Sequence, residues 1–265
     1  MSKVIVITGS TKGIGYGLAE EFLKLGQRVV VSGRKQDALD QAVAKLSVAY
    51  TDKVVGCLCD VSKLEDHERL FAFAKEKFGR VDYWINNAGV AHQQRNLWEL
   101  SNEVVETVVK SNVLGSLYGT RTAYNGMMAQ GGGWIYNFEG FGSNGNVREG
   151  ITLYGMTKAA IAFMGKSLAV ELKDSPVKTG LIQPGMVITD MVTGQYSDPQ
   201  EFAKVKPIFN IIASRLEDVV PVLAEKILTN ETNGARIDFL QRWKLMMRFF
   251  TAPFVKRNVF DDKQK

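Results

Sequence analysis

A tyrosine and a lysine four residues apart, Tyr154 and Lys158, are the side chains of this chain best suited to acid–base chemistry. On a helix, residues at this spacing lie one above the other on the same face. A phenol loses its proton only near pH ~10, and a neighbouring ammonium group lowers that pKa because it stabilises the phenolate. The pair is therefore predicted to exchange a proton if another group supplies electrons. Read alone, the spacing also fits an exposed lysine beside a half-buried tyrosine.

A glycine-rich segment follows the first apolar run of the sequence. Residues 4–7 are apolar and β-branched, which is typical of a buried strand, and residues 18–25 have the apolar spacing of a helix. Between them lie Gly9, Gly13 and Gly15. Glycines let a backbone approach closely, and the first N–H groups of a helix attract anions. The segment predicts a site for the pyrophosphate of a dinucleotide, with a simple tight turn as the alternative.

The residues after the second predicted strand, residues 28–32, indicate which dinucleotide is bound. Folds of this kind that bind NAD place an acidic residue here, against the ribose 2′-hydroxyl. This chain has Gly33 and Arg34 instead, and Lys12 lies inside the glycine segment. Two cations without an acid favour the 2′-phosphate of NADP(H).

Strand-like and helical segments alternate along the rest of the chain. Ser62 and Glu65 have the spacing of a capping box at a helix start. Further strands are predicted at 53–59, 81–85, 134–138 and 179–183, and helices at 36–46, 62–79, 101–128 and 154–173. This alternation predicts one α/β domain with a doubly wound parallel sheet.

Four motifs in order make the chain resemble the short-chain dehydrogenase/reductases over about residues 3–240. They are the glycine segment, Asn86-Asn87-Ala88-Gly89, Tyr154-x-x-x-Lys158 and Pro184-Gly185. The resemblance implies a single Rossmann-type domain, residues 1–240, with a mostly parallel seven-stranded sheet. It implies an NADP(H)-dependent oxidoreductase in which Tyr154 protonates the substrate oxygen, Lys158 assists Tyr154, and Asn112 organises a water beside the lysine.

The resemblance, together with the two cations, also predicts the cofactor contacts. These are Gly9, Ser10, Thr11, Lys12, Gly13, Ile14, Gly15, Arg34, Asp60, Val61, Asn87, Ala88, Gly89, Tyr154, Lys158, Pro184, Gly185, Val187 and Thr189. No metal site is predicted. The family is commonly dimeric or tetrameric, so a homodimer or homotetramer through the helices at 101–128 and 157–173 is expected.

The segment before the tyrosine departs from the family pattern. The family's substrate-positioning serine usually lies at the place that Phe141 occupies here. Ser143 is the nearest hydroxyl, and we predict it as the catalytic serine because the flanking glycines permit unusual backbone paths. The alternative is that the usual hydroxyl is absent.

The same departure makes the chain similar to one group within the family, the chlorophyll(ide) b reductases. That group has the string Asn137-x-acid-Gly140-x-Gly-Ser143-x-Gly between strand and tyrosine, and segments 7–16, 84–89 and 184–190 are also similar. The similarity implies NADPH-dependent reduction of the formyl group of chlorophyll(ide) b to hydroxymethyl. Alternatives are reduction of another apolar aldehyde or ketone, a nucleotide-binding module that has lost catalysis, and a membrane-associated scaffold acting through its tail.

Residues 190–214 are rich in apolar side chains and follow Pro184-Gly185, where the family places its substrate-covering segment. Such a segment is predicted to close over an apolar substrate. Plain core packing is the alternative.

Residues 241–265 are predicted to form a basic amphipathic extension. Trp243, Met246, Met247 and Phe250 recur at helical spacing, with Arg242 and Arg248 set apart from them and Lys256 and Arg257 following. Through residues 241–257 such a helix can lie on a membrane surface. It can equally pack on the domain or on a sister subunit.

Charge and composition limit the partners. The net charge is +5, and residues 236–265 hold eight Lys or Arg against three Asp, so residues 1–235 are neutral overall. A nucleic-acid partner is therefore not predicted. No apolar run reaches the ~18 residues of a membrane span, and the first strand leaves no room for a signal peptide. Cys57 and Cys59 are expected to be buried free thiols of a cytoplasmic protein.

Overall fold

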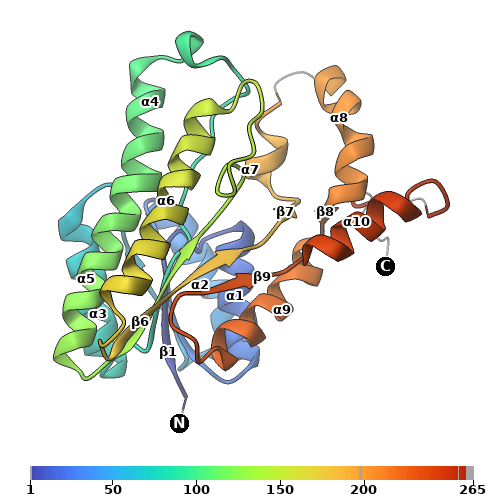
Figure 1. Cartoon of the computed structure of the whole chain (residues 1–265). Helices are drawn as coiled ribbons and strands as arrows, with labels where there is room; N and C mark the ends of the chain where they lie inside the picture. Colours follow the sequence, from blue (N-terminus) through green and yellow to red (C-terminus); the bar gives the residue numbers. More distant parts are fainter. Residues whose placement is uncertain (1, 197–198, 256, 261–265) are drawn as a thin grey trace.

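The computed structural model describes residues 2–196, 199–255 and 257–260. Its centre is a sheet of parallel strands in the order β3-β2-β1-β4-β5-β6-β9 (Figure 1). The strands are β1 (Val4–Ile7), β2 (Arg28–Gly33), β3 (Val54–Leu58), β4 (Tyr83–Asn86), β5 (Gly133–Phe138), β6 (Val177–Gln183) and β9 (Ala235–Asp238). The predicted seven-stranded parallel sheet of a single α/β domain is confirmed.

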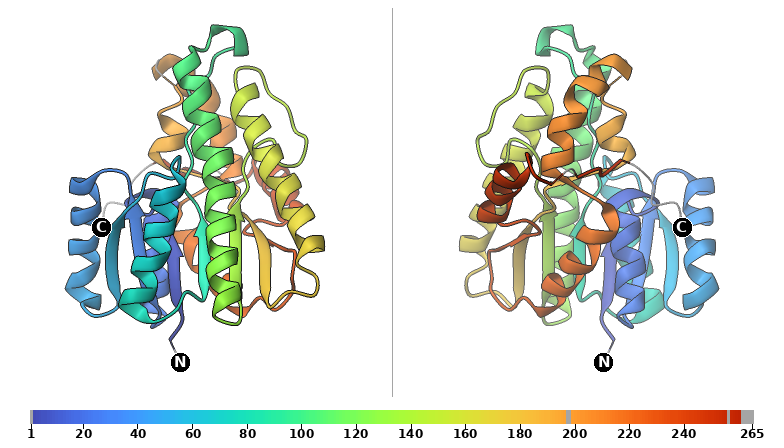
Figure 2. Two further views of the ribbon diagram at one scale, coloured as in Figure 1. Left: turned by 90° about the vertical axis from the view of Figure 1, so that its left-hand side faces the viewer. Right: turned by 90° about the vertical axis from the view of Figure 1, so that its right-hand side faces the viewer.

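Helices cover both faces of the sheet, as Figure 2 shows from two sides. One face carries α1 (Gly13–Lys24), α2 (Gln36–Tyr50) and α9 (Leu216–Thr229), and the other carries α3 (Leu64–Phe78), α4 (Asn102–Val109), α5 (Gly115–Ala129) and α6 (Thr152–Glu171). All four residues of β1 are buried, because a strand in the middle of such a sandwich has no face toward water.

Smaller elements lie beyond the carboxyl edge of the sheet, toward the top and right of Figure 1. They are the 3₁₀ turn Leu97–Glu99, β7 (Met186–Val187), α7 (Asp190–Thr193), α8 (Pro199–Ile212), β8 (Ala213–Ser214) and α10 (Arg242–Thr251). β7 and β8 form a separate parallel pair. None of the helices in the described part of the chain is long and apolar enough to cross a membrane.

The sequence pattern located six strands and missed the seventh, β9, together with α9. α9 buries a stripe of apolar residues against α1: Val219, Val220, Leu223, Ala224 and Ile227. β9 has only four residues and two charged side chains, so it lacks the apolar run that marks the other strands.

The predicted capping box at Ser62 is wrong. α3 begins at Leu64, and its N-cap residue is Lys63, whose side chain makes no capping bond. The Ser62 hydroxyl instead donates to Asp60 Oδ1 at 2.8 Å, since that carboxylate lies two residues away. Cys57 and Cys59 are buried free thiols, as predicted.

Candidate active site

A crevice is expected where the chain leaves β1 and β4, because the strand order reverses between them. Two loops meet there. The Asn87 side chain donates to the carbonyls of Thr8 and Gly9 at 2.9 and 3.0 Å. The Thr8 hydroxyl accepts from the backbone N–H groups of Asn87 and Ala88, both at 3.1 Å. These bonds join the glycine loop, residues 8–15, to residues 86–89.

The predicted glycines divide into two roles. A Cβ on Gly9, whose φ is +62°, would lie 2.8 Å from Ala88 Cα, and a Cβ on Gly15 would collide with the Asn87 amide. These two glycines are therefore required by packing between the loops. Gly13 has a φ of +60° and meets only the Thr189 methyl group at 3.8 Å, so it faces the open crevice.

The first turn of α1 offers an anion site. Its N-cap residue is Lys12, which makes no side-chain capping bond, so the first N–H groups of the helix have no side-chain acceptor there. Ser10 does not face this site. Its buried hydroxyl donates to Ile7 O at 2.7 Å and accepts from Ser32 N–H at 2.9 Å, which fastens the loop to β2.

The two predicted cations come from the end of β2 and from the glycine loop. Arg34 is exposed directly after the strand. Lys12 is also exposed, and its amine lies 3.0 Å from Asp190 Oδ2. This ion pair joins the glycine loop to α7, which the sequence did not predict.

Asp60 lies at the end of β3 and binds its own loop. Its Oδ1 accepts from the Ser62 N–H and hydroxyl groups at 3.0 and 2.8 Å. Partial burial raises the pKa of Asp60, but the bonds from Ser62, together with the charges of Lys63 and Arg34, outweigh burial and hold that pKa below its usual range. The carbonyl of Val61 contacts His67 Nε2 at 2.9 Å.

Pro184, Gly185, Val187 and Thr189 form the opposite side of the crevice. Gly185 turns the chain with a φ of +73° after β6. Val187 is buried in β7, and Thr189 precedes α7. The close approach of Thr189 to Gly13 brings this side to the glycine loop.

Tyr154 and Lys158 lie on α6, as the spacing predicts. The Lys158 amine is buried, donates to Phe138 O at 3.0 Å, and lies 5.9 Å from the centre of the Tyr154 ring. Burial lowers the pKa of Lys158 to about 8, and the charge of Glu139 opposes that shift. Burial raises the pKa of Tyr154 to about 12. The expected lowering of the tyrosine pKa is therefore wrong for this structure, because burial penalises the phenolate.

Asn112 lies in a π-helical turn, Lys110–Leu114, that joins α4 to α5. Its side chain accepts from Val90 N–H at 2.8 Å and donates to Val90 O and to the Thr157 hydroxyl, both at 3.0 Å. Asn112 thus joins the loop after β4 to α6, one residue from Lys158. Its predicted part in holding a water stays a prediction.

Gly140 lies beside the phenol. A Cβ on Gly140 would lie 2.7 Å from the Tyr154 hydroxyl oxygen. Ser143 turns back to this glycine: its Oγ accepts from Gly140 N–H at 2.9 Å and donates to Gly140 O at 2.7 Å. The serine is therefore fixed next to the residue that touches Tyr154, while its catalytic role stays a prediction.

A buried network below the site was missed by the sequence reading. Asn86 accepts from Trp84 Nε1 at 2.8 Å and donates to Asn137 Oδ1 at 2.9 Å and Thr120 Oγ1 at 3.1 Å. Asn86 and Asn137 are partners in the register of β4 and β5. The sequence feature that could have indicated this network is a pair of asparagines near the ends of two neighbouring apolar strands.

The predicted covering segment is an aromatic cluster. Phe202 lies 5.6 Å from Tyr196, 6.3 Å from Phe209 and 5.2 Å from Phe260, between ring centres. Arg148 ties this cluster to the loop before α6, donating to the Tyr196 hydroxyl at 2.8 Å. The segment thus has packing of its own, and its closure over a substrate stays a prediction.

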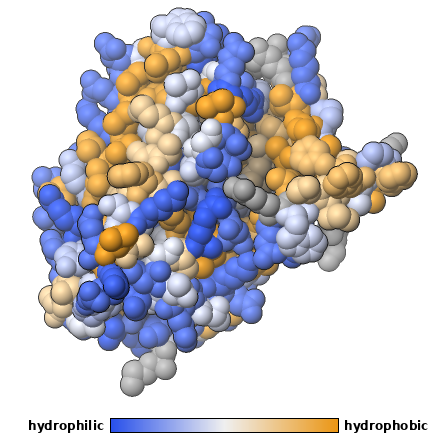
Figure 3. Space-filling view, in the orientation of Figure 1, coloured by the Kyte–Doolittle hydropathy of each residue, from blue (hydrophilic) through white to orange (hydrophobic). Residues whose placement is uncertain are grey.

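The tail begins with α10, which exposes Trp243, Met246, Met247 and Phe250. Figure 3 shows apolar surface on this helix and on neighbouring α8. Lys256 and residues 261–265 lie outside the described residues, as does the Arg242 side chain.

Two arginines of the tail bind the domain instead of forming a basic surface. Arg248 donates to the Ser214 hydroxyl at 3.0 Å and to Ala213 O at 3.3 Å. Arg257 donates to Ile211 O at 2.6 Å and to Ala213 O at 3.1 Å. The tail is therefore anchored to the end of the covering segment.

The short chain dehydrogenase family matches residues 3–200. The chain belongs to this family. It is an oxidoreductase family, so the predicted resemblance is confirmed. A bovine protein named "Dehydrogenase/reductase SDR family member 4" is 33% identical over 79% of the chain and 75% of its own length.

Plant relatives are similar over nearly the whole chain. "Chlorophyll(ide) b reductase NOL, chloroplastic" of Arabidopsis thaliana is 37% identical over 94% of the chain and 72% of its own length. "Probable chlorophyll(ide) b reductase NYC1, chloroplastic" of Oryza sativa subsp. japonica is 35% identical over 98% of the chain. The chain spans 54% of that relative's length.

A solved structure supports the fold. The 3-ketoacyl-(acyl-carrier-protein) reductase of Brucella melitensis, complexed with NADH, aligns with a TM-score of 0.75 at 26% identity. The alignment covers 89% of this chain and 96% of that one.

Replacement of Gly140 by alanine tests the packing around the phenol. The added methyl group would lie 2.7 Å from the Tyr154 hydroxyl oxygen and displace it. We expect Gly140→Ala to reduce oxidoreductase turnover by about tenfold or more, equivalent to ~1.4 kcal/mol of barrier, and to leave nucleotide affinity unchanged. Gly155→Ala is the control, because its Cβ would have no neighbour closer than 3.9 Å. Equal turnover in Gly140→Ala and Gly155→Ala would contradict the placement of Gly140 beside the Tyr154 hydroxyl.

Proposed function

We propose that the protein is an NADPH-dependent reductase that converts an aldehyde or ketone to an alcohol, and that its substrate is the formyl group of chlorophyll(ide) b. The observation that carries the proposal is the buried Lys158 amine beside Tyr154, next to a glycine where a side chain would obstruct the phenol. The identity of 37% to a named chlorophyll(ide) b reductase over 94% of the chain supports the substrate.

The residues around the crevice fit a nicotinamide dinucleotide. The uncapped first turn of α1 has N–H groups for a pyrophosphate, and Gly13 leaves the approach open. Arg34, directly after β2, and Lys12, in the glycine loop, offer two exposed cations, which suit a 2′-phosphate and support NADP(H). Lys12 would exchange its bond to Asp190 for the phosphate.

Three side chains of the protein have separate roles in the reduction. When bound, the cofactor supplies the hydride. Tyr154, whose pKa is raised to about 12, holds its proton at neutral pH and donates it to the forming alkoxide. The Lys158 ammonium stabilises the negative charge that then develops on the phenol oxygen. Ser143 hydrogen-bonds the substrate carbonyl.

An apolar covering segment suits a large apolar substrate. Its cluster of Tyr196, Phe202 and Phe209 follows β7, at the carboxyl edge of the sheet. Phe209 is buried within the cluster, whereas Tyr196 and Phe202 are partly exposed and would be available to stack on a planar ligand.

We also propose that α10 contacts a membrane surface. Trp243 and Phe250 are 59% and 69% exposed, whereas Arg248 fixes the helix to the domain. An apolar stripe on an anchored helix can bury itself in lipid headgroups. The homodimer or homotetramer stays a prediction.

The reaction is tested with Tyr154→Phe. Anaerobic incubation of the wild-type protein with NADPH and chlorophyllide b is expected to yield the hydroxymethyl product, detected by absorbance and chromatography. Without the phenol proton donor, Tyr154→Phe should lose about 10²–10⁴-fold in turnover and keep its affinity for NADPH. Turnover of another apolar aldehyde but not of the pigment would contradict the narrower proposal. No turnover of any carbonyl would favour a nucleotide-binding module.

Cofactor choice is tested with Arg34→Ala. Loss of one charge-assisted contact to the 2′-phosphate should weaken NADPH binding by about tenfold or more, with little change for NADH, as measured by fluorescence titration. Lys35→Ala is the matched control, since Lys35 is exposed one residue further on. Tighter binding of NADH than of NADPH by the wild-type protein would show that the cofactor is NAD.

Membrane contact is tested by co-sedimentation with vesicles of phosphatidylcholine and phosphatidylglycerol. Replacing Trp243 and Phe250 by serine should weaken vesicle binding by about tenfold or more, because the apolar area available for burial is lost. Val48→Ser is the control, since Val48 is 88% exposed on α2, away from both the tail and the helices expected to join subunits. Wild-type protein that stays in the supernatant would refute the contact.

A further inference from the structure

Glu139 is a buried acid that the proposed reaction does not use. It follows β5 directly, and its side chain is only 3% exposed. A buried carboxylate is costly unless it is paired and hydrogen-bonded. Its position beside the catalytic helix therefore requires an explanation.

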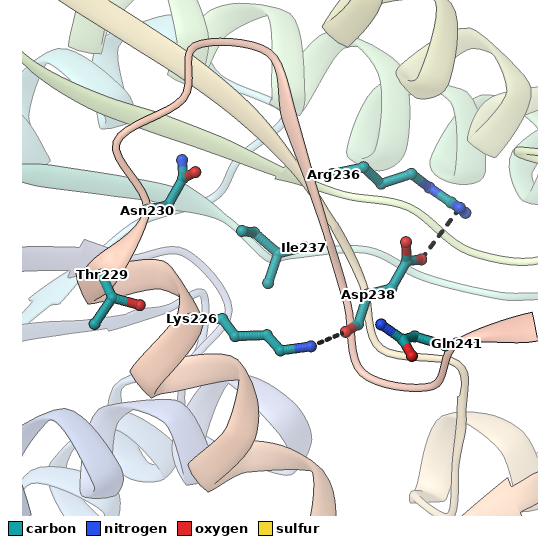
Figure 4. A pocket seen from close by; sticks show the side chains of 7 residues that line it. All are labelled: Lys226, Thr229, Asn230, Arg236, Ile237, Asp238 and Gln241. Atoms are coloured by element: carbon teal, nitrogen blue, oxygen red, sulfur yellow. Dashed lines mark hydrogen bonds and ion pairs between the residues drawn. The ribbon is translucent and has the colours of Figure 1, made fainter. Parts of the chain in front are cut away.

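The carboxylate is paired with an arginine from the edge of the sheet. Glu139 Oε2 lies 2.6 Å from Arg236 Nε, and Arg236 Nη1 lies 3.1 Å from Asp238 Oδ1. Figure 4 shows Arg236 extending toward Asp238 on β9. Leu181 of β6 is in register with both Asn137 and Arg236, so the ion pair spans β6. The pair thus connects the exit of β5 to β9.

Glu139 stands between the two residues that touch the catalytic side chains. Phe138, before it, accepts the hydrogen bond from Lys158 Nζ at 3.0 Å. Gly140, after it, lies beside the Tyr154 hydroxyl. A change in the Glu139 side chain would therefore act on the backbone that contacts both Lys158 and Tyr154.

The charge of Glu139 also reaches Lys158. Burial lowers the pKa of Lys158, and among the described residues Glu139 is the acid whose charge raises it. Two further groups near the amine in the described part of the chain are neutral: the Tyr154 phenol on α6 and, across Gly89, the Asn112 amide on the π turn. The group that faces Glu139 from β9 is the Arg236 cation.

We propose that Glu139 is a positioning residue that keeps the Lys158 ammonium group charged and directed at the Phe138 carbonyl, with Arg236 holding the Glu139 carboxylate in place. The inference deepens the proposed reductase function and rests on it for its catalytic meaning. The effect of the Glu139 carboxylate on Lys158 can be measured whether or not the reaction is the one proposed.

The link is tested by nuclear magnetic resonance on the protein without nucleotide, with lysine labelled at the ε-carbon and Lys158 assigned by Lys158→Met. A lysine is charged below its pKa, and loss of a nearby carboxylate makes the charged form less stable. The Lys158 midpoint, expected near pH 8 in the wild-type protein, should therefore fall by about one pH unit in Glu139→Gln. Glu139→Asp keeps the charge and should stay close to the wild-type value.

Asp238→Asn is the matched control. Asp238 binds the same arginine, so this variant also loses one ion pair of Arg236, but Glu139 remains charged. Its Lys158 midpoint should equal that of the wild-type protein. Equal midpoints in Glu139→Gln and Asp238→Asn would overturn the inference, as would a fall in Glu139→Asp as large as that in Glu139→Gln.

Turnover gives the second measurement. The alkaline limb of the pH dependence of kcat should move to lower pH in Glu139→Gln in parallel with the Lys158 midpoint, and should not move in Asp238→Asn. A wild-type protein that reduces no carbonyl would refute the proposed function, while the resonance titration would still decide whether Glu139 acts on Lys158. An unchanged limb in an active Glu139→Gln would refute its part in catalysis.

Discussion

The burial of the Lys158 ammonium group is the constraint on which the site depends. An amine removed from water must find charge or hydrogen-bond partners, or it loses its proton. Here the partners come from one short segment: Phe138 offers its carbonyl, and Glu139 offers its charge. β5 must therefore end at the level of Lys158 on α6. The register of β5 with its neighbours is thus tied to the chemistry as well as to the packing of the sheet.

The same edge of the sheet has to leave room for a dinucleotide. Asn87 and Thr8 close the gap between the two loops with four hydrogen bonds, and Gly9 and Gly15 let those loops touch. These bonds occupy the Thr8 side chain and the carbonyls of Thr8 and Gly9. The first N–H groups of α1 and the exposed cations Lys12 and Arg34 are available to an anion.

The sequence predicted features that depend on residues close together in the chain. It missed features that depend on contacts between other groups of the folded structure. Runs of apolar β-branched residues located six strands, and the spacing of Tyr154 and Lys158 placed both on one helix. β9 was missed because its neighbour β6, and not its own composition, makes it a strand. Arg248 looked like a surface charge because the Ala213 carbonyl and the Ser214 hydroxyl that it binds lie more than thirty residues earlier. The capping box failed because Asp60, two residues before Ser62, competes for its hydroxyl.

The position of Ser143 also depends on contacts that the sequence does not show. Gly140 occupies the space beside the phenol, so no side chain obstructs a large substrate there. Ser143 reaches back to that glycine through both its donor and its acceptor capacity. To bind a carbonyl oxygen, the hydroxyl must give up its bond to Gly140 O, at a cost of about 0.5–1.5 kcal/mol, while the bond from Gly140 N–H can remain. A bond to a carbonyl that gains negative charge in the reaction is stronger than one to a neutral carbonyl. A serine held in this way is therefore better suited to the developing alkoxide than to the substrate in its ground state.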